Sequence, residues 1–106
     1  MKKFLFLSLL STVYLLPSVS YSYTSLGRPT GFVNDFAGVL TIEQKQNLET
    51  KLSEFEKLSK NEISVVTIKS LGGDTVENFA EKLFQEWGVG KEAEDNGVLL
   101  LVAVED

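Results

Sequence analysis

Apolar residues recur with helical periodicity in the middle of the chain. Leu48, Leu52, Phe55 and Leu58 follow one another at spacings of four, three and three, which places them on one stripe of a helix. Thr41 and Gln44 have the spacing of a capping box. The pattern predicts an amphipathic helix from about residue 42 to 59. Its opposite face carries charged residues, which we expect in solvent: Glu43, Lys45, Glu49, Glu54 and Lys57.

A second segment has a clearer helical period. Asp74 or Thr75 is placed to cap it, and Gly88 and Gly90 are placed to end it. Its apolar residues fall at i, i+3, i+4, i+7, i+8 and i+11, which is the spacing of one buried helix face. They are Val76, Phe79, Ala80, Leu83, Phe84 and Trp87.

Two further segments have the composition of strands. Residues 63–68 are dense in β-branched side chains, and residues 98–104 are apolar without interruption. Such continuous runs are typical of parallel strands that are covered on both faces, and we expect 98–104 to be a central one. Residues 31–40 are apolar but irregular, with turn-forming residues among them, so we expect a packed loop there.

The expected order is helix, strand, helix, strand, which is an α/β fold. The strand-helix-strand part has room for a right-handed parallel crossover, so we expect an α/β/α sandwich. Two parallel strands make a poor sheet, because 98–104 would keep one neighbour and an open edge. We therefore expect a truncated domain that is marginally stable or self-associating.

The first 22 residues have the three parts of a secretory signal peptide. Lys2 and Lys3 precede an uncharged segment, residues 4–16, and Ser20 and Ser22 provide small residues for cleavage after Ser22. Cleavage two residues earlier stays open. An uncleaved membrane anchor is less favoured, because Pro17 and the serines after it interrupt the apolar run.

These boundaries divide the chain into a signal peptide over 1–22, a linker over 23–30 and one domain over 31–106. The expected location is the periplasm or the cell envelope. Cleavage would remove two lysines and no acidic residue, so the net charge of -5 would become -7. Such an acidic product repels phosphate backbones, so we expect no nucleic-acid partner.

The residue inventory excludes several chemistries. The chain has no cysteine and no histidine, so it carries neither a Ser-His-Asp nor a Cys-His nucleophile, nor the usual zinc ligands. Gly72-Gly73 lacks the lysine of a phosphate-binding loop, and no third glycine follows Gly88 and Gly90 at the dinucleotide-binding spacing. We expect no organic cofactor.

Two acidic-amide pairs lie in expected loops. Asn34-Asp35 and Asp95-Asn96 offer carboxylate and amide oxygens, the hard ligands that Ca²⁺ and Mg²⁺ prefer. Two carboxylates are few for a metal site. The other interpretation, which stays open, is that the first pair forms an Asx-turn and the second a β-turn with Gly97.

Four ordered motifs resemble the TPM domain family, which includes YgcG-type bacterial envelope proteins and thylakoid lumen acid phosphatases. The motifs are Gly31 to Leu40 before the capped helix, Ile63 to Ile68, Trp87 to Gly90, and Asp95 to Leu101. The resemblance covers residues 31–106, the N-terminal half of such a domain. It implies an exported α/β/α sandwich that is associated with calcium.

The resemblance also implies site residues and roles. It marks Asp35 and Asp95 as metal-site residues, with Asn34 and Asn96 beside them, and it leaves the catalytic residues unknown. We expect an envelope module that acts with a membrane-protein partner or by self-association. The alternatives are a phosphatase assisted by a divalent metal, which would hydrolyse phosphomonoesters, and an inactive truncated product.

The export signal makes one prediction from sequence alone. We expect the accumulated protein to begin at Tyr23, because the small residues at Ser20 and Ser22 suit the specificity of signal peptidase. Mass spectrometry of the protein isolated from the cell envelope measures its N-terminus. An intact Met1 in the membrane fraction would indicate an anchor instead.

Overall fold

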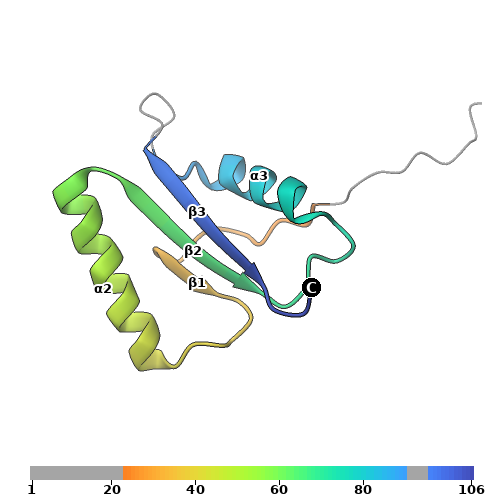
Figure 1. Cartoon of the computed structure of the whole chain (residues 1–106), viewed down its shortest axis with the longest axis horizontal. Coiled ribbons are helices and arrows are strands. Elements are labelled where there is room, and N and C mark those ends of the chain that lie inside the picture. The colour runs from red at the N-terminus through yellow and green to blue at the C-terminus, as the bar shows by residue number, and fades with distance from the viewer. Residues whose placement is uncertain (1–22, 91–95) are drawn as a thin grey trace, which may run out of the picture.

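The structure is a computed structural model that describes residues 23–90 and 96–106. Its elements alternate along the chain (Figure 1). They are β1 (Val33–Asp35), α2 (Ile42–Ser59), β2 (Glu62–Ile68), α3 (Val76–Trp87) and β3 (Gly97–Ala103). The prediction of an α/β fold is confirmed.

The first helix has the expected bounds and cap. The Thr41 hydroxyl accepts a hydrogen bond from the Gln44 N–H at 3.1 Å, and the Gln44 side chain accepts one from the Thr41 N–H at 2.9 Å. These reciprocal bonds satisfy two of the donors that every helix start leaves without a partner. The capping box that the sequence predicts is therefore confirmed for α2.

The second helix, α3, is capped by Thr75 rather than by Asp74. The Thr75 hydroxyl accepts from the Asn78 N–H at 3.1 Å, while the Asp74 carboxylate is buried and accepts from the Thr75 N–H and the Asn78 side chain. Gly88 ends the helix with φ +58°, a left-handed conformation that costs glycine no strain.

The three strands form a parallel sheet in the order β1-β2-β3. Two expectations are wrong here. The segment 31–40 is not only a packed loop, because Val33–Asp35 pairs with Val65, Val66 and Thr67 of β2. The apolar strand β3 is not central, because within the described residues it pairs with β2 alone. The central strand is β2.

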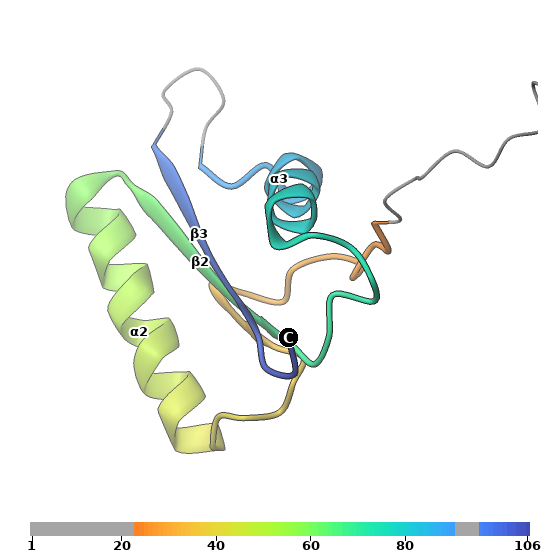
Figure 2. The same cartoon turned by 45° about the vertical axis from the view of Figure 1, so that its right-hand side comes forward.

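The helices lie on opposite faces of this sheet, which makes the expected α/β/α layers (Figure 2). Helix α2 packs on β1 and β2, whereas α3 packs on the other face. The connection from β1 to β2 passes through α2, and the connection from β2 to β3 passes through α3. Both lead across the sheet in the same direction, but the two helices lie on opposite faces. The two crossovers therefore have opposite hands. One of them is therefore of the uncommon left-handed kind.

The main core lies between the sheet and α3. Val66 and Ile68 of β2 pack there with Phe79 and Leu83 of α3, and all four are buried. Half-buried side chains of β3 extend this cluster along the same face of the sheet: Leu99, Leu101 and Ala103. The periodic stripe of α3 is therefore core, as its spacing predicts.

The segment 23–30, which we expected to be a linker, packs along α3. The Tyr23 ring meets Phe79 edge-on at 4.9 Å between centroids, and the Tyr23 hydroxyl donates to Glu86 at 2.8 Å. Partial burial and the neighbouring Glu86 carboxylate raise the pKa of Tyr23 well above its ordinary value. The Trp87 indole N–H donates to the Gly27 carbonyl at 2.7 Å. These contacts hold the segment against α3.

Glu49 is not a solvated residue of the polar helix face, which corrects the sequence-based expectation. Its carboxylate accepts from the backbone N–H of Phe32 at 2.7 Å and of Val33 at 2.8 Å. Gly31 permits this approach, because a Cβ there would lie 2.6 Å from a Glu49 oxygen. A helix side chain thus satisfies two N–H groups where β1 begins.

We predict that Glu49→Ala destabilises the domain more than Glu54→Ala does. The first change removes a charged acceptor from two backbone donors, and hydrogen bonds to charged groups are each worth about 1.5–3 kcal/mol. Glu54 lies on the same helix and is exposed, so its loss has little cost. Urea unfolding of both variants measures the difference, and equal free energies of unfolding would contradict this role of Glu49.

Candidate functional site

Asp35 ends β1 and is held by its own chain. Its carboxylate accepts from the Thr67 hydroxyl of β2, from the Val39 N–H at 3.1 Å and from the Leu40 N–H at 2.9 Å. These bonds, with that from Thr67 the largest cause, lower the pKa of Asp35 below its ordinary value. The carboxylate therefore organises the turn between β1 and α2.

Asn34 is buried, with 2% of its surface exposed, and it also organises backbone. Its side-chain oxygen accepts from the Thr30 N–H at 2.8 Å, and its amide donates to the Gly31 carbonyl at 3.0 Å. Adjacent strand residues point to opposite faces of a sheet, so Asn34 and Asp35 face apart. They do not converge on a common ligand.

Asn96 lies at the other end of the sheet from Asp35. Asp35 pairs with Thr67, whereas Gly97, which follows Asn96, pairs with Glu62. Five residues of β2, from Glu62 to Thr67, separate these levels, which is about 17 Å along the strand. The register therefore separates Asn96 from Asp35.

Asp95, the fourth residue of the expected metal site, lies outside the described residues. Within residues 23–90 and 96–106, no three acidic, histidine or cysteine side chains form a group that could hold a metal ion. Asn96 donates from its side-chain amide to the Lys60 carbonyl, which joins the end of α2 to the start of β3. The three described residues of the expected site, Asn34, Asp35 and Asn96, thus all have hydrogen bonds to the backbone of their own chain.

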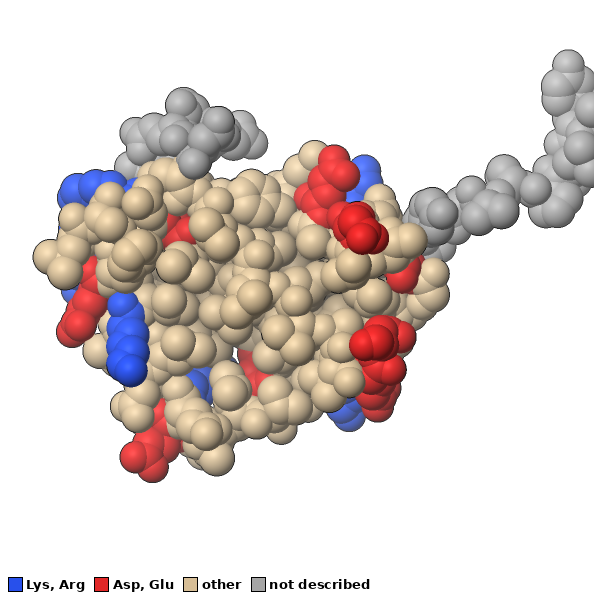
Figure 3. Space-filling view, in the orientation of Figure 1, with Lys and Arg blue, Asp and Glu red and all other residues tan. Residues whose placement is uncertain are grey.

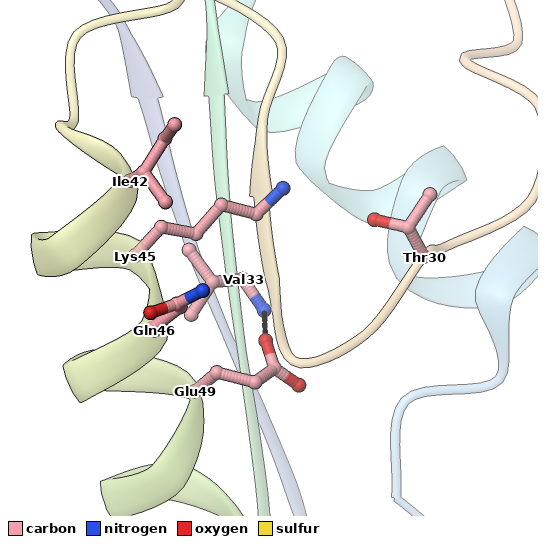
Figure 4. Close-up of a pocket in the computed structure, with 6 residues that line it drawn as sticks. All are labelled: Thr30, Val33, Ile42, Lys45, Gln46 and Glu49. Atoms are coloured by element: carbon pink, nitrogen blue, oxygen red, sulfur yellow. Dashed lines mark hydrogen bonds between the residues drawn. The ribbon is translucent and has the colours of Figure 1, made fainter.

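A cavity of about 460 Å³ opens between α2 and β1 (Figure 4). Figure 4 shows Lys45, Gln46 and Glu49 extending from the helix toward it, with Val33 beneath them. The Glu49 carboxylate is already engaged with backbone N–H groups. Lys45 is exposed as expected, and only the turn of Glu49 toward β1 departs from the sequence pattern, which carries no local signal for this cavity. The full lining is Thr30, Val33, Ile42, Lys45, Gln46 and Glu49.

A second feature is an apolar surface on the α2 side of β3, which we call the β3 face. It consists of Val98, Leu100 and Val102, whose exposed fractions are 56%, 53% and 43%. They share this face with Val65 of β2, but α2 stops short of them, because it packs on β1 and β2. Their neighbours in sequence point into the core beneath α3.

The apolar stripe of α2 borders the β3 face. Ile42 and Gln46 line the cavity on the β1 side of the helix. At about 100° per residue, Leu48, Leu52 and Phe55 lie toward the opposite side, where β3 runs. Phe55 is 41% exposed. In Figure 3 a broad, almost uncharged area crosses the visible surface, with charged residues at its margins.

None of the helices that the structure describes is long and apolar enough to cross a membrane. Exposed apolar residues occur on several elements, and on β3 three of them, Val98, Leu100 and Val102, lie side by side on one face. Contiguous apolar surface of this kind marks contact sites more often than scattered single residues do. The β3 face is therefore the described surface best suited to binding another molecule.

We predict that Asp35→Asn lowers thermal stability at neutral pH. The amide offers one acceptor oxygen where the carboxylate offers two, so one backbone donor loses its partner. The pKa of Asp35 is lowered on folding, so its stabilisation is complete above the ordinary value of 3.8 and is lost as the pH falls through the lowered one. Thermal melting from pH 7 to pH 2 should show the difference between the two proteins shrinking at acid pH. A difference that does not change with pH would contradict a role for the ionised carboxylate.

Comparison with known proteins gives one finding on identity. No similar sequence was found among curated proteins. The family model of the TPM domain matches residues 33–106, which is more than half of the chain and includes every strand and helix of the fold. This agrees with the resemblance of the motifs from Gly31 to Leu101. The chain belongs to the TPM domain family.

Proposed function

We propose that this protein is an exported, non-catalytic binding module of the cell envelope that acts with a membrane-protein partner. The observation that supports it best is the uncovered β3 face. Parallel strands this apolar are normally covered on both faces, and α3 covers only one face of β3. A partner that covered the other face would complete the usual layers.

The energetics favour contact with protein. Complete burial of a valine or leucine side chain stabilises by about 1.5–3 kcal/mol, and the residues of the β3 face keep roughly half of their surface exposed. Covering all three would add a few kcal/mol, which is a useful share of a binding free energy. The face carries no charge, so an apolar protein surface suits it better than a phosphate backbone.

The phosphatase alternative has less support from the site. Metal assistance requires carboxylates whose oxygens can reach an ion. Both oxygens of Asp35 already accept from its own chain, and Asn34 is buried on a different face. A protein that only binds a partner needs no metal ligand or catalytic group at Asn34 or Asp35.

The location rests on the first residues of the chain. The sequence 1–22 has the organisation of a signal peptide, and the absence of histidine and cysteine suits a protein whose role is contact rather than chemistry. An exported module with an apolar face would meet its partner at the membrane surface, where membrane proteins present extracytoplasmic segments.

Site-specific photo-crosslinking tests this function. A photoreactive amino acid at Val102 of the full chain, expressed in its host, should crosslink to a membrane protein that mass spectrometry identifies. The same amino acid at Ile42, which is 79% exposed on the β1 side of α2, is the matched control and should give no such product.

A direct enzyme assay tests the alternative. Hydrolysis of p-nitrophenyl phosphate by the native protein, with Ca²⁺ or Mg²⁺ present, should stay at background. Metal-dependent turnover that Asp35→Asn abolishes would contradict the non-catalytic function. Crosslinking from Ile42 equal to that from Val102 would show that the β3 face is not the binding site.

A further inference from the structure

Asn96 and Gly97 lie where the ends of several elements meet. The Asn96 side-chain amide donates to the carbonyl of Lys60, which caps the end of α2. Its own carbonyl accepts from the N–H of Glu62, the first residue of β2, at 2.8 Å. Gly97 begins β3 and lies against the backbone of Gly90, which follows α3. We call these five residues the junction.

The pair Asn96-Gly97 also has the sequence from which asparagine loses ammonia most readily. The backbone nitrogen that follows an asparagine can attack its side-chain carbonyl carbon, and a glycine in that place has no side chain to obstruct the attack. Of the five asparagines in the chain, Asn96 alone precedes a glycine. Asparagine is one of the residues that are chemically labile on heating. Asn96 is therefore the position at which spontaneous modification is most expected.

We propose that Asn96 is a modification site that the fold controls. The junction suppresses deamidation while the domain is folded, opening of the junction permits it, and the product prevents the chain from folding again. Each chain would thus be removed irreversibly from the folded population after it opens. This inference concerns the lifetime of the protein and is independent of the proposed function.

The reaction needs only water. The Gly97 nitrogen forms a bond to Cγ of Asn96, the bond from Cγ to Nδ2 breaks, and the proton of the Gly97 N–H leaves with Nδ2 as ammonia. Water then opens the cyclic imide at one of its two carbonyl carbons. Opening at the side-chain carbonyl gives aspartate. Opening at the backbone carbonyl gives isoaspartate, in which the main chain runs through the former side chain.

The two hydrogen bonds of Asn96 suppress the first step. Its side-chain amide is held by Lys60, and its backbone carbonyl is held by Glu62. Ring closure turns Cγ onto the Gly97 nitrogen, so the amide must leave the Lys60 carbonyl. Cyclisation therefore competes with the contact that joins α2 to β3.

Water can reach the site in the folded protein. Asn96 and Gly90 border a cavity of about 290 Å³, which is polar and large enough for water. The other residues that line it are charged: Glu56, Lys57, Lys60 and Glu62. Protection in the folded state therefore comes from the geometry of the junction and not from exclusion of water.

The fold needs both residues of the reactive pair. A Cβ at Gly97 would lie 2.4 Å from the Val89 carbonyl oxygen, which is closer than side chains approach. Asn96 supplies the donor for the Lys60 carbonyl. Packing and hydrogen bonding thus explain why a labile sequence stands at the start of β3.

The product does not fit the junction. Isoaspartate adds one carbon to the main chain directly before Gly97, where the backbone of Gly90 leaves no room even for a Cβ. The added carbon also moves β3 out of the register in which Gly97 pairs with Glu62. Both products replace the amide by a carboxylate, which has no hydrogen to donate to the Lys60 carbonyl.

Mass spectrometry of the intact full chain measures the reaction, because exchange of the amide nitrogen for oxygen raises the mass. At mildly alkaline pH, the gain should be about tenfold slower or more in buffer than in urea, since a folded chain reacts only through its open form. Asn96→Gln should abolish the rapid gain in urea, because its longer side chain must close a larger ring. Equal rates in buffer and urea, or a rapid gain that persists in Asn96→Gln, would overturn the proposal.

Two glycine variants test the junction itself. Gly90→Ala places a Cβ 2.5 Å from the Gly97 nitrogen, and it should raise the rate in buffer toward the rate in urea. Gly72→Ala is the matched control, because Gly72 also has a positive φ, +63°, but a Cβ there meets no atom within 4 Å. Its rate should stay slow. Equal acceleration in the two variants would show that general loss of stability, and not the junction, controls the reaction.

Refolding tests the effect of the product. Deamidated chains gain a negative charge, so ion exchange separates them after incubation in urea, and the isoaspartate fraction resists a protease that cleaves at aspartate. When urea is removed, unmodified chains should regain a cooperative unfolding transition and isoaspartate chains should not. Asn96→Asp keeps the normal main chain, so it should fold with a lower midpoint of unfolding. Isoaspartate chains that refold like unmodified ones would contradict the claim that the product prevents folding.

Discussion

The need to cover β2 on both sides and both faces organises this molecule. β2 pairs with β1 along one side and with β3 along the other. Val66 and Ile68 anchor α3 on one face, and α2 packs on the other. A parallel strand cannot pair through a short hairpin, so each neighbour of β2 arrives through a helical crossover. The layers of the fold follow from that requirement.

The same arrangement leaves the two edge strands unequal. β1 has three residues, and the Glu49 carboxylate of α2 accepts from the N–H of its first residue, Val33. β3 has seven residues without a charge, and α2 lies too far toward β1 to cover its second face. The described surface best suited to binding is therefore the one that the helices fail to reach, and the proposed function rests on it.

The acidic-amide pair at the end of β1 has hydrogen bonds to donors of its own chain. Carboxylate and amide oxygens suit a cation, but they also suit nearby backbone N–H groups, which have a high effective concentration. The Asp35 carboxylate accepts from the N–H groups of Val39 and Leu40, and the Asn34 side-chain oxygen accepts from the N–H of Thr30. Asp35 and Asn34 therefore contribute to the local fold, and a role in binding a cation stays a prediction.

Local signals in the sequence determined the helices and β2. The capping box at Thr41, the periodic stripe that ends at Trp87 and the β-branched run from Ile63 to Ile68 all depend on neighbours within a few residues, so pattern alone placed them. The motif order also identified the TPM family. The sequence motif also marks Asp95 as a metal-site residue, but Asp95 lies outside the described residues.

Only the tertiary structure decided β1, the place of β3 and the role of Glu49. β1 has only three residues, too few to show the two-residue period of a strand. An apolar run such as β3 has the same sequence pattern whether its strand is central or at the edge of the sheet. Glu49 contacts residues 16 and 17 positions earlier, and no local pattern reports such a contact. Sequence fixes local conformation through short-range sterics and hydrogen bonds, whereas packing between distant segments decides which edges and faces stay open.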